Sequence, residues 1–387
     1  MLIERLTIHC LSIPFVLAFQ HATKDRRSSD AIIVELHGGG VSGYGEALPR
    51  EYVTGETESL LVSQLTDHVW PRLRGAVVDA AAPDVLEAIG ALLDEALGAP
   101  EPAPARAPGV VAFHSLRCAL ELALVDAWLR LNRRGLAELL PPSTPAVAYS
   151  GVISSGSVER AAGLARKMLL GGLQQIKIKV GDEQDEQRVE AVRAVVGSGC
   201  SLRVDANGAW GEQQALRKLE RLAALGVVSC EEPLGRAQQA ALPRLVAASP
   251  IPIMVDESLV TAADARWLLE QRGCHAFNLR LNKLGGLLPC LRLARAASEH
   301  GVWCQLGSHV GETSVLAAAG RHLALHLGGL RFVEGSFGSL LLSQDIASPS
   351  IKFGHGGRGG GIGGPGLGAS VVPARLAACT VRRWGLE

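Results

Sequence analysis

The stretch Leu202-Arg203-Val204-Asp205-Ala206-Asn207-Gly208 is typical of the end of a strand, because an apolar run ends on an acid and a glycine follows shortly after. Runs of the same kind recur on both sides at a nearly constant spacing of 24–26 residues, and each ends on a charged or polar side chain. These end residues are Lys179, Asp205, Glu231, Asp256, Arg280 and Gln305. This regular spacing predicts a repeated strand–helix unit.

Eight such runs follow one another along the second half of the chain, and a helix-length segment separates each run from the next. They cover residues 147–153, 175–180, 201–206, 227–232, 252–257, 276–281, 302–307 and 331–336. Strands that alternate with helices pair in parallel through right-handed crossovers. Eight units in roughly 200 residues therefore predict an α/β fold with a (β/α)8 barrel of the TIM type.

The first part of the chain predicts a smaller α+β unit. Meandering strand-like runs are separated by a polar loop at 19–28, and a proline-rich surface loop lies at 99–108. Three runs have strand character, namely 2–11, 31–36 and 41–47.

An i, i+3, i+4 stripe of apolar residues at 116–128 predicts a helix that buries one face and joins the two domains. We therefore expect a capping domain at residues 1–130 and a barrel at 145–354 that carries the metal and catalytic site. A returning segment at 355–387 is expected to complete the capping domain.

Composition excludes several classes of partner. Lys+Arg and Asp+Glu number 38 each in 387 residues, so no net charge attracts nucleic acid or an anionic membrane. No apolar run reaches the roughly 18–20 residues of a membrane-spanning helix. Eight cysteines without a C-x-x-C pair are typical of reduced thiols, and the first residues do not resemble a secretion signal. We therefore expect a cytoplasmic protein.

Three acids predict a metal site. Asp205, Glu231 and Asp256 end the third, fourth and fifth predicted strands, and neighbouring strands lie roughly 4.8 Å apart. Bare carboxylates at that range repel one another, and a divalent cation removes the conflict. Oxygen ligands without Cys or His favour Mg²⁺, with Mn²⁺ as a substitute. The alternative is that these acids cap the helices that follow.

Two lysines predict a general base. Lys177 and Lys179 lie two residues apart on one predicted strand, so both point to the same face. If that face is the barrel interior, each ammonium lowers the pKa of the other, and Lys179 at the strand tip becomes a base near neutral pH. The alternative is a pair of solvated lysines.

These motifs together resemble the enolase superfamily, in its mandelate racemase and muconate-lactonizing branch. The resemblance is closest to the muconate-lactonizing subgroup, which includes dipeptide epimerases and o-succinylbenzoate synthases. The segment Gly43-Tyr44-Gly45-Glu46-Ala47 is similar to its capping domain. The barrel motifs are Lys177-x-Lys179, Asp205-x-Asn207, Glu231-Glu232-Pro233, Asp256-Glu257-Ser258 and Asn278-x-Arg280-x-x-Lys283-x-Gly285-Gly286.

The resemblance implies Mg²⁺-assisted removal of the proton α to a carboxylate, through an enediolate. It implies that Lys179 is the base, that Lys177 tunes it, and that the three acids are the metal ligands. Loops at 19–28 and 50–55 would close over a small-molecule carboxylate substrate. The resemblance further implies a homo-oligomer. Specificity residues in these loops would include Phe19, His21 and Tyr52.

The sequence departs from the subgroup at Arg280, where a lysine is usual on the face opposite Lys179. Arginine is a poor base but a good carboxylate clamp. His309, after the seventh predicted strand, is either the second acid/base or a loop histidine. Glu334 and Ser336 are expected to line the far side of the pocket. The acid there either recognises a substrate ammonium or caps a helix.

The leading functional prediction is an isomerase: a racemase, an epimerase or a cycloisomerase. The first alternative is a lyase, either a dehydratase of a hydroxy acid or an o-succinylbenzoate synthase-like enzyme. One-base elimination tolerates Arg280 better than racemisation does. The second alternative is a non-catalytic binding protein on an enzyme scaffold.

Overall fold

A sheet of eight parallel strands in sequence order forms the largest part of the structure. The structure is a computed structural model that describes residues 1–20, 25–79, 84–98, 111–154 and 156–387. A bridge between Tyr149 and Val333 joins the two ends of this sheet, so the sheet curls into the predicted TIM-type barrel. The strands are β7 (Gly151–Ile153), β8 (Gln175–Lys179), β9 (Ser201–Asp205), β10 (Val227–Glu231), β11 (Ile253–Val255), β12 (Ala276–Leu279), β13 (Trp303–Leu306) and β14 (Phe332–Val333).

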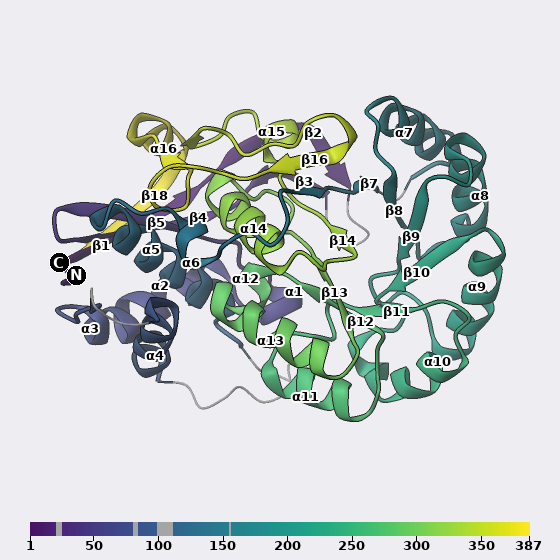
Figure 1. The fold of residues 1–387 in the computed structure, drawn as a ribbon, viewed down its shortest axis with the longest axis horizontal. Coiled ribbons are helices and arrows are strands. Elements are labelled where there is room, and N and C mark those ends of the chain that lie inside the picture. Colours follow the sequence, from purple (N-terminus) through teal and green to yellow (C-terminus); the bar gives the residue numbers. More distant parts are fainter. Residues whose placement is uncertain (21–24, 80–83, 99–110, 155) are drawn as a thin grey trace.

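Helices surround the barrel strands (Figure 1). Their sequences are amphipathic: α9 buries only Ala215, Leu219 and Leu222, which lie on one face at helical spacing. Short helices α12 (Leu281–Leu284) and α15 (Gly338–Leu341) follow β12 and β14. The longer helices are α7 (Val158–Leu170), α8 (Asp185–Val196), α9 (Glu212–Ala224), α10 (Leu242–Ala248), α11 (Ala262–Glu270), α13 (Leu287–Glu299) and α14 (Ser314–Leu327).

A second sheet lies at the other end of the molecule, where Figure 1 places both termini. It is antiparallel, in the order β18-β1-β4-β5, so the C-terminal strand returns to the N-terminal strand. Its strands are β1 (Arg5–Leu11), β4 (Ile32–Gly38), β5 (Val41–Ala47) and β18 (Thr380–Leu386). The helices of this part are α1 (Glu51–Thr54), α2 (Glu58–Ser63), a π-helical turn Gln64–Val69, α3 (Trp70–Leu73), α4 (Val85–Leu97), α5 (His114–Leu131), α6 (Leu136–Leu139) and α16 (Pro373–Cys379).

Helix α5 is buried on every side, and the prediction that it buries one face is wrong. Every residue from Ser115 to Leu129 is buried, because β4 and β5 pack on one side of the helix and α12 and α13 on another. The close approach of β5 depends on Gly43 and Gly45. A Cβ atom at Gly45 would collide with the carbonyl oxygen of Ala119 on α5.

Gly45→Ala is therefore expected to destabilise the protein by about 3 kcal/mol or more, since the backbone of α5 must shift to admit the methyl group. Urea unfolding followed by circular dichroism measures this. Gly385→Ala in β18 of the same sheet is the control, because nothing lies within 4 Å of its Cβ position. Equal stabilities of the two variants would contradict the packing argument.

Two other segments differ from the sequence-based expectation. The first predicted strand is divided into β6 (Ala146–Ala148), which pairs with β16 (Arg358–Gly360), and the barrel strand β7. The predicted polar loop at 19–28 overlaps a hairpin of β2 (Ile13–Gln20) and β3 (Asp25–Ser29). Within the described residues, no helix is both long and apolar enough to cross a bilayer.

Candidate active site

Charged residues at the carboxyl ends of neighbouring strands meet at one end of the barrel. Lys179 on β8 is in register with Asp205 on β9, and Asp205 is in register with Glu231 on β10. Asp256 and Arg280 directly follow β11 and β12. A pocket of about 310 Å³ lies over this end, and both Lys179 and Arg280 line it.

The three acids are buried, and each pairs with a cation. Asp205 and Glu231 are fully buried and Asp256 nearly so. Taken in isolation, buried carboxylates this close would be costly, so the cations compensate their charge. The pairs are Lys179 with Asp205 (Nζ to Oδ2, 2.6 Å), Lys177 with Glu231 (Nζ to Oε2, 3.1 Å), Lys283 with Asp256 (Nζ to Oδ1, 2.9 Å) and Arg280 with Asp256.

Repulsion from the neighbouring acids still acts on Glu231 despite these cations. Burial raises the pKa of Glu231 to about 7, and the charges of Asp205 and Asp256 add to the rise. Among the described residues, no three His, Cys, Asp or Glu side chains form a ready metal cluster, and the three carboxylates each face a cation instead. The donor set still suits Mg²⁺, because it consists of buried carboxylates on neighbouring strand ends whose mutual repulsion a divalent cation would relieve.

Both lysines of β8 point into the barrel. Lys177 is buried, and its Nζ atom lies 2.9 Å from Glu334 and 3.2 Å from Asp205. Burial alone would lower the pKa of Lys177, but Glu231, Glu334 and Asp205 outweigh burial and raise it. The expected lowering of this pKa by the neighbouring ammonium is therefore not seen. Lys179 lies nearer the pocket, where its Nζ donates to Asn207 Oδ1 at 2.8 Å.

Arg280 occupies the side of the barrel opposite Lys179. Lys179 ends the second of the eight strands and Arg280 directly follows the sixth, and these two strands face each other across a closed barrel. Besides its ion pair with Asp256, the Arg280 guanidinium lies 3.5 Å from Glu231. Arg280 therefore faces the metal-ligand candidates as well as the pocket.

Glu334 lines the pocket, but its charge is already compensated. It pairs with Lys177 and with Arg203, a buried arginine on β9 whose Nη1 also donates to Ser150 Oγ at 3.1 Å. The expectation that Glu334 recognises a substrate ammonium therefore conflicts with its contacts. Ser336 lines the same wall and accepts a hydrogen bond from Arg321 at 3.1 Å.

Two of the remaining predicted residues line the pocket, and the side chains of the other two lie outside the described part of the structure. His309 is buried and lines the pocket, and its backbone N–H donates to Glu312 Oε1 at 2.5 Å. Tyr52 lines the pocket mouth and is half exposed. Phe19 belongs to strand β2, but its side chain lies outside the described part, and His21 lies outside the described residues altogether.

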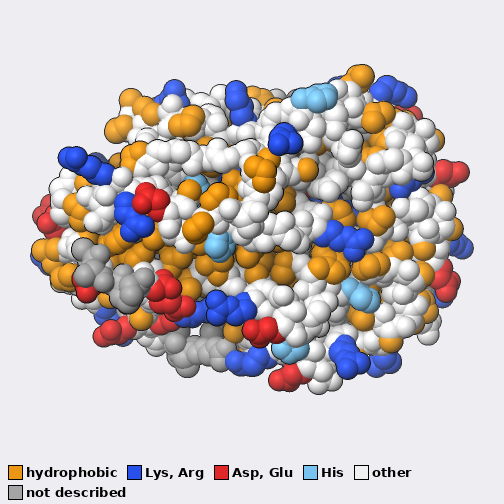
Figure 2. Space-filling model, viewed as in Figure 1, with side chains coloured by type: hydrophobic (Ala, Val, Ile, Leu, Met, Phe, Trp, Pro, Cys, Tyr) orange, Lys and Arg blue, Asp and Glu red, His pale blue; other side chains and the backbone are white. Residues whose placement is uncertain are grey.

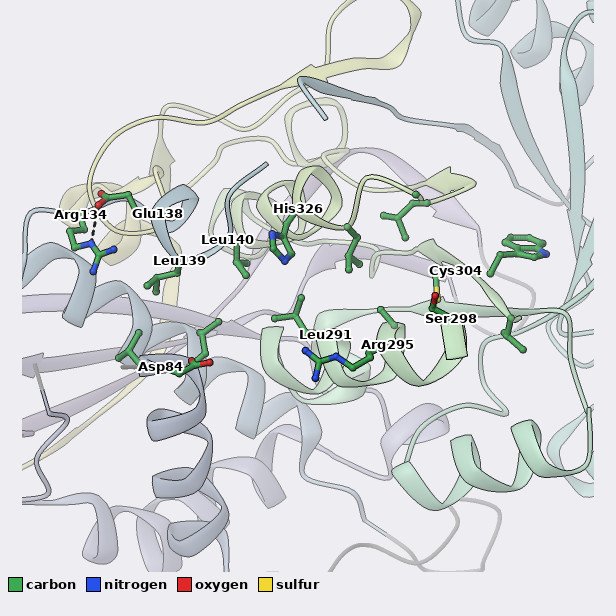
Figure 3. A pocket seen from close by; sticks show the side chains of 18 of the residues that line it. Asp84, Arg134, Glu138, Leu139, Leu140, Leu291, Arg295, Ser298, Cys304 and His326 are labelled. Carbon is green, nitrogen blue, oxygen red and sulfur yellow. Dashed lines mark hydrogen bonds and ion pairs between the residues drawn. The ribbon is translucent and has the colours of Figure 1, made fainter. Parts of the chain in front are cut away.

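A larger cavity, of about 920 Å³, lies away from this chemistry. Figure 2 shows hydrophobic side chains gathered between α13 and α14, and Figure 3 shows the groove there, with Leu291 and Arg295 on one wall and His326 on the other. Trp303, the first residue of β13, also lines it, which places the groove toward the amino-terminal ends of the strands. Cavity volume alone would therefore point to the amino-terminal end of the barrel, whereas active sites in this fold form at the carboxyl-terminal end.

The sequence matches the family described as enolase C-terminal domain-like over residues 160–375, more than half of the chain. The chain belongs to the enolase superfamily. The predicted resemblance and the TIM-type fold are thereby confirmed.

Relatives within the superfamily match over nearly the whole chain. L-Ala-D/L-Glu epimerase of Bacillus subtilis is 28% identical, over 91% of this chain and 93% of the relative. The crystal structure of N-succinyl Arg/Lys racemase from Bacillus cereus superposes with a TM-score of 0.89 at 26% identity, covering all of both chains. A dipeptide epimerase from Enterococcus faecalis, complexed with Mg and L-Leu-L-Tyr, has a TM-score of 0.84 at 25% identity, over 96% of this chain and 100% of its own.

These relatives are enzymes, so the prediction that this superfamily member is an enzyme is confirmed, and the isomerase class is the one that the comparisons support.

The structure adds residues that the sequence did not assign. Glu232 has a left-handed backbone (φ 40°), and its side chain accepts hydrogen bonds from the amides of Asp256 (2.7 Å) and Ser258 (3.2 Å), so it orders the turn that presents Asp256. Lys283 Nζ donates hydrogen bonds to the backbone carbonyl oxygen and to Oδ1 of Asp256 and so holds the same acid in place. Arg203 could have been found from strand periodicity, because it lies two residues before Asp205 and therefore on the same face.

Proposed function

We propose that this enzyme is an isomerase that removes the α-proton of a small carboxylate substrate and returns a proton to the product, with Mg²⁺ as cofactor. The observation that carries the proposal is the placement of Lys179 and Arg280 on opposite sides of one pocket, above three buried carboxylates. The names of the relatives, an epimerase and a racemase, support an α-carbon as the reacting centre.

Asp205, Glu231 and Asp256 would hold Mg²⁺, as the dipeptide epimerase complexed with Mg suggests by analogy. When bound, the ion supplies positive charge that stabilises an enediolate relative to its parent carboxylate. Glu232 and Lys283 keep Asp256 in place by fixing its backbone amide and its Oδ1 atom.

Lys179 removes the proton in this proposal. Its contacts with Asp205 and Asn207 hold Nζ at the pocket floor, so the amine is positioned before a substrate arrives. In the deprotonated state this amine accepts the α-proton, and the electron pair of the broken C–H bond passes into the carboxylate as an enediolate. Lys177 lies behind it as a permanent cation that holds Glu231 and Glu334.

Arg280 and His309 serve the opposite face. Arginine keeps its proton at working pH, so Arg280 stabilises the anion as a fixed charge and does not deliver a proton to it. His309 lines the same pocket, and we assign to its imidazole the protonation of the second face. A racemase needs this second donor.

Deuterium exchange tests the assignment of the two faces. In D₂O, each stereoisomer of a turned-over substrate is expected to exchange its α-proton. His309→Asn should remove exchange from one isomer, and Lys179→Ala should remove it from the other. Proton NMR with a chiral product assay measures both. Two-sided exchange that survives intact in His309→Asn would exclude His309 from this role.

A one-base elimination is the second candidate, and Arg280 favours it. If only one face exchanges protons, Lys179 can remove the α-proton while His309 protonates a β-hydroxyl that leaves as water, as in a dehydratase. The Arg280→Lys variant separates the candidates: restoring a titratable lysine should increase two-sided exchange in an isomerase but leave an elimination one-sided. The non-catalytic alternative is not retained, because the relatives are enzymes.

A further inference from the structure

The turn that carries His309 lies between strand β13 and helix α14, over residues 309–312. Two hydrogen bonds close it: the backbone N–H of His309 donates to Glu312 Oε1 at 2.5 Å, and the backbone N–H of Glu312 donates to the His309 carbonyl oxygen at 3.4 Å. The second distance is longer than the roughly 2.7–3.2 Å of a good N–H···O bond, so this bond is weak. The turn therefore depends on contacts from elsewhere in the molecule to keep one shape.

Two of these contacts come from much earlier in the chain. The Ser29 hydroxyl, at the end of β3, donates to the carbonyl oxygen of Gly311 at 2.6 Å, and this bond is buried. The Arg50 guanidinium, at the N-cap of α1, donates to the carbonyl oxygen of Val310 at 3.2 Å. These donors lie 282 and 260 residues before the carbonyls that they hold. Both carbonyls at the tip of the turn are thus anchored from outside the barrel.

The packing at the tip is as close as the hydrogen bonds suggest. Gly311 has a left-handed backbone (φ 97°), which favours glycine, and a Cβ atom there would lie 3.0 Å from Ser29 Oγ and 3.1 Å from Ser29 Cβ. The turn therefore rests directly on the end of β3, and a change in the Ser29 side chain acts on the turn without an intermediate residue.

Glu46 of β5 holds the point where the same segment enters α14. Its fully buried side chain accepts hydrogen bonds from the Thr313 backbone N–H (2.8 Å), the Thr313 hydroxyl (2.7 Å) and the Leu316 N–H (3.0 Å). Thr313 is the N-cap of α14 and directly follows the turn. An acid that accepts the first amides of a helix stabilises the start of that helix. Segment 29–50 thus fixes both the tip of the turn and its exit.

We propose that Ser29 and Arg50 are positioning residues for the second face of the reaction, because they hold the turn that presents His309 to the pocket. This inference rests on the proposed function, since the position of the turn matters for turnover only if His309 transfers a proton. Proton transfer needs donor and acceptor within hydrogen-bond reach, so a small displacement of the turn reduces the rate strongly.

The opposite face does not depend on these contacts. Lys179 is held by Asp205 Oδ2 at 2.6 Å and by Asn207 Oδ1 at 2.8 Å, and both partners belong to the barrel. Loosening the turn should therefore affect the proton transferred by His309 and spare the proton transferred by Lys179. This asymmetry separates a positioning role from a general loss of structure.

Isomer-selective exchange in D₂O tests the inference on the Mg²⁺-loaded enzyme. The probes are N-propionyl and L-alanyl derivatives of the L and D forms of leucine, lysine and glutamate, and the pair of isomers that the wild type exchanges fastest is used for the variants. Ser29→Ala is expected to slow exchange of the isomer that depends on His309 by about 10–100-fold. Exchange of the isomer that depends on Lys179 should stay unchanged. Ser29 does not line the pocket, so its effect cannot come from contact with the substrate.

Ser42→Ala is the matched control, because the Ser42 hydroxyl belongs to β5 and donates to Glu35 at 3.1 Å instead of to the turn. Both isomers should exchange at the wild-type rate in this variant. Arg50→Met should slow the same isomer as Ser29→Ala. Arg50 also lines the pocket, so an equal loss for both isomers in Arg50→Met would assign it to substrate binding and overturn its positioning role.

Amide hydrogen–deuterium exchange followed by mass spectrometry tests the contact without any substrate. Peptides that cover residues 307–316 are expected to exchange several-fold faster in Ser29→Ala than in Ser42→Ala, because the turn loses an anchor. Peptides that cover β8 and β9 should exchange equally in the two variants, which shows that the barrel remains folded. Equal exchange of the 307–316 peptides would overturn the inference.

Failure of the inference and failure of the proposed function are distinguishable. If His309→Asn removes exchange of one isomer but Ser29→Ala leaves it at the wild-type rate, or slows both isomers equally, the inference is wrong and the proposed function stands. If His309→Asn leaves both isomers unchanged, or the wild type exchanges none of the probes, the proposed function is wrong, and the catalytic role of the turn falls with it.

Discussion

Lys179→Ala is expected to lower kcat by about 10²–10⁴-fold or more while Mg²⁺ still binds, because the variant removes the base but none of the three carboxylates. The pocket floor should remain intact, since Lys177 also contacts Asp205, at 3.2 Å, and continues to compensate its charge. Steady-state kinetics and calorimetry with Mg²⁺ on the same preparation measure the two quantities separately.

Lys167→Ala provides the matched control, because Lys167 is an exposed lysine on α7 and does not line the pocket. It should keep wild-type kinetics. If Lys179→Ala also turned over at the wild-type rate, another residue would have to be the base. A loss of Mg²⁺ affinity in Lys179→Ala would show that the lysine supports the metal site and would weaken its assignment as a base.

Asp205→Asn, Glu231→Gln and Asp256→Asn are each expected to abolish tight Mg²⁺ binding and turnover, since each replaces a charged oxygen ligand with an amide. Calorimetry with Mg²⁺ checks this directly. Tight binding retained by all three variants would refute the ligand assignment.

Without metal, Asp256→Asn and Glu231→Gln should differ in their free energies of unfolding, because the pKa values of the two carboxyl groups shift in opposite directions. The pKa of Asp256 is lowered: burial opposes its ionisation, but Arg280 and Lys283 outweigh burial. Its ionised form therefore stabilises the fold above the unfolded-state pKa of about 4, and this stability is lost as the pH falls through the lower folded-state pKa. Asp256→Asn leaves two buried cations without that partner and should cost about 3–5 kcal/mol at pH 7.

The pKa of Glu231 shifts in the opposite direction to that of Asp256. Its pKa is raised to about 7, by burial first and by Asp205 next, so its ionised form is disfavoured in the metal-free protein. Glu231→Gln should accordingly cost much less than Asp256→Asn at pH 8. Urea unfolding in EDTA compares the two, and equal destabilisation would contradict the charge argument.

The sequence predicted the barrel well because one physical rule repeats in it. Apolar runs end on polar tips, and parallel strands bring such tips to one edge, so Asp205, Glu231 and Asp256 could be placed together without coordinates. Side-chain alternation likewise placed Lys177 and Lys179 inside the barrel. Helix α5 was misjudged because an apolar stripe does not reveal that the remaining face, which includes Glu121 and Asp126, is also buried.

Pairings between distant strands could not be read from the sequence. The contact of Arg203 with Glu334 joins the third and eighth strands, and it changes Glu334 from a free acid into a compensated one. The raised pKa of Lys177 has the same origin, because Glu231 and Glu334 reach it from β10 and from the end of β14. Local patterns identify which groups are present, but the closed barrel determines their partners.

Proton exchange at the substrate α-carbon is the decisive measurement for Mg²⁺-dependent proton removal. The wild-type enzyme is incubated in D₂O with N-propionyl and L-alanyl derivatives of L-leucine, L-lysine and L-glutamate, once with Mg²⁺ and once with EDTA, and the α-proton signal is followed by NMR. The signal of at least one compound is expected to disappear with Mg²⁺ and to persist with EDTA. Exchange that continues at the same rate in EDTA, or that occurs with none of the compounds in Mg²⁺, would contradict this expectation.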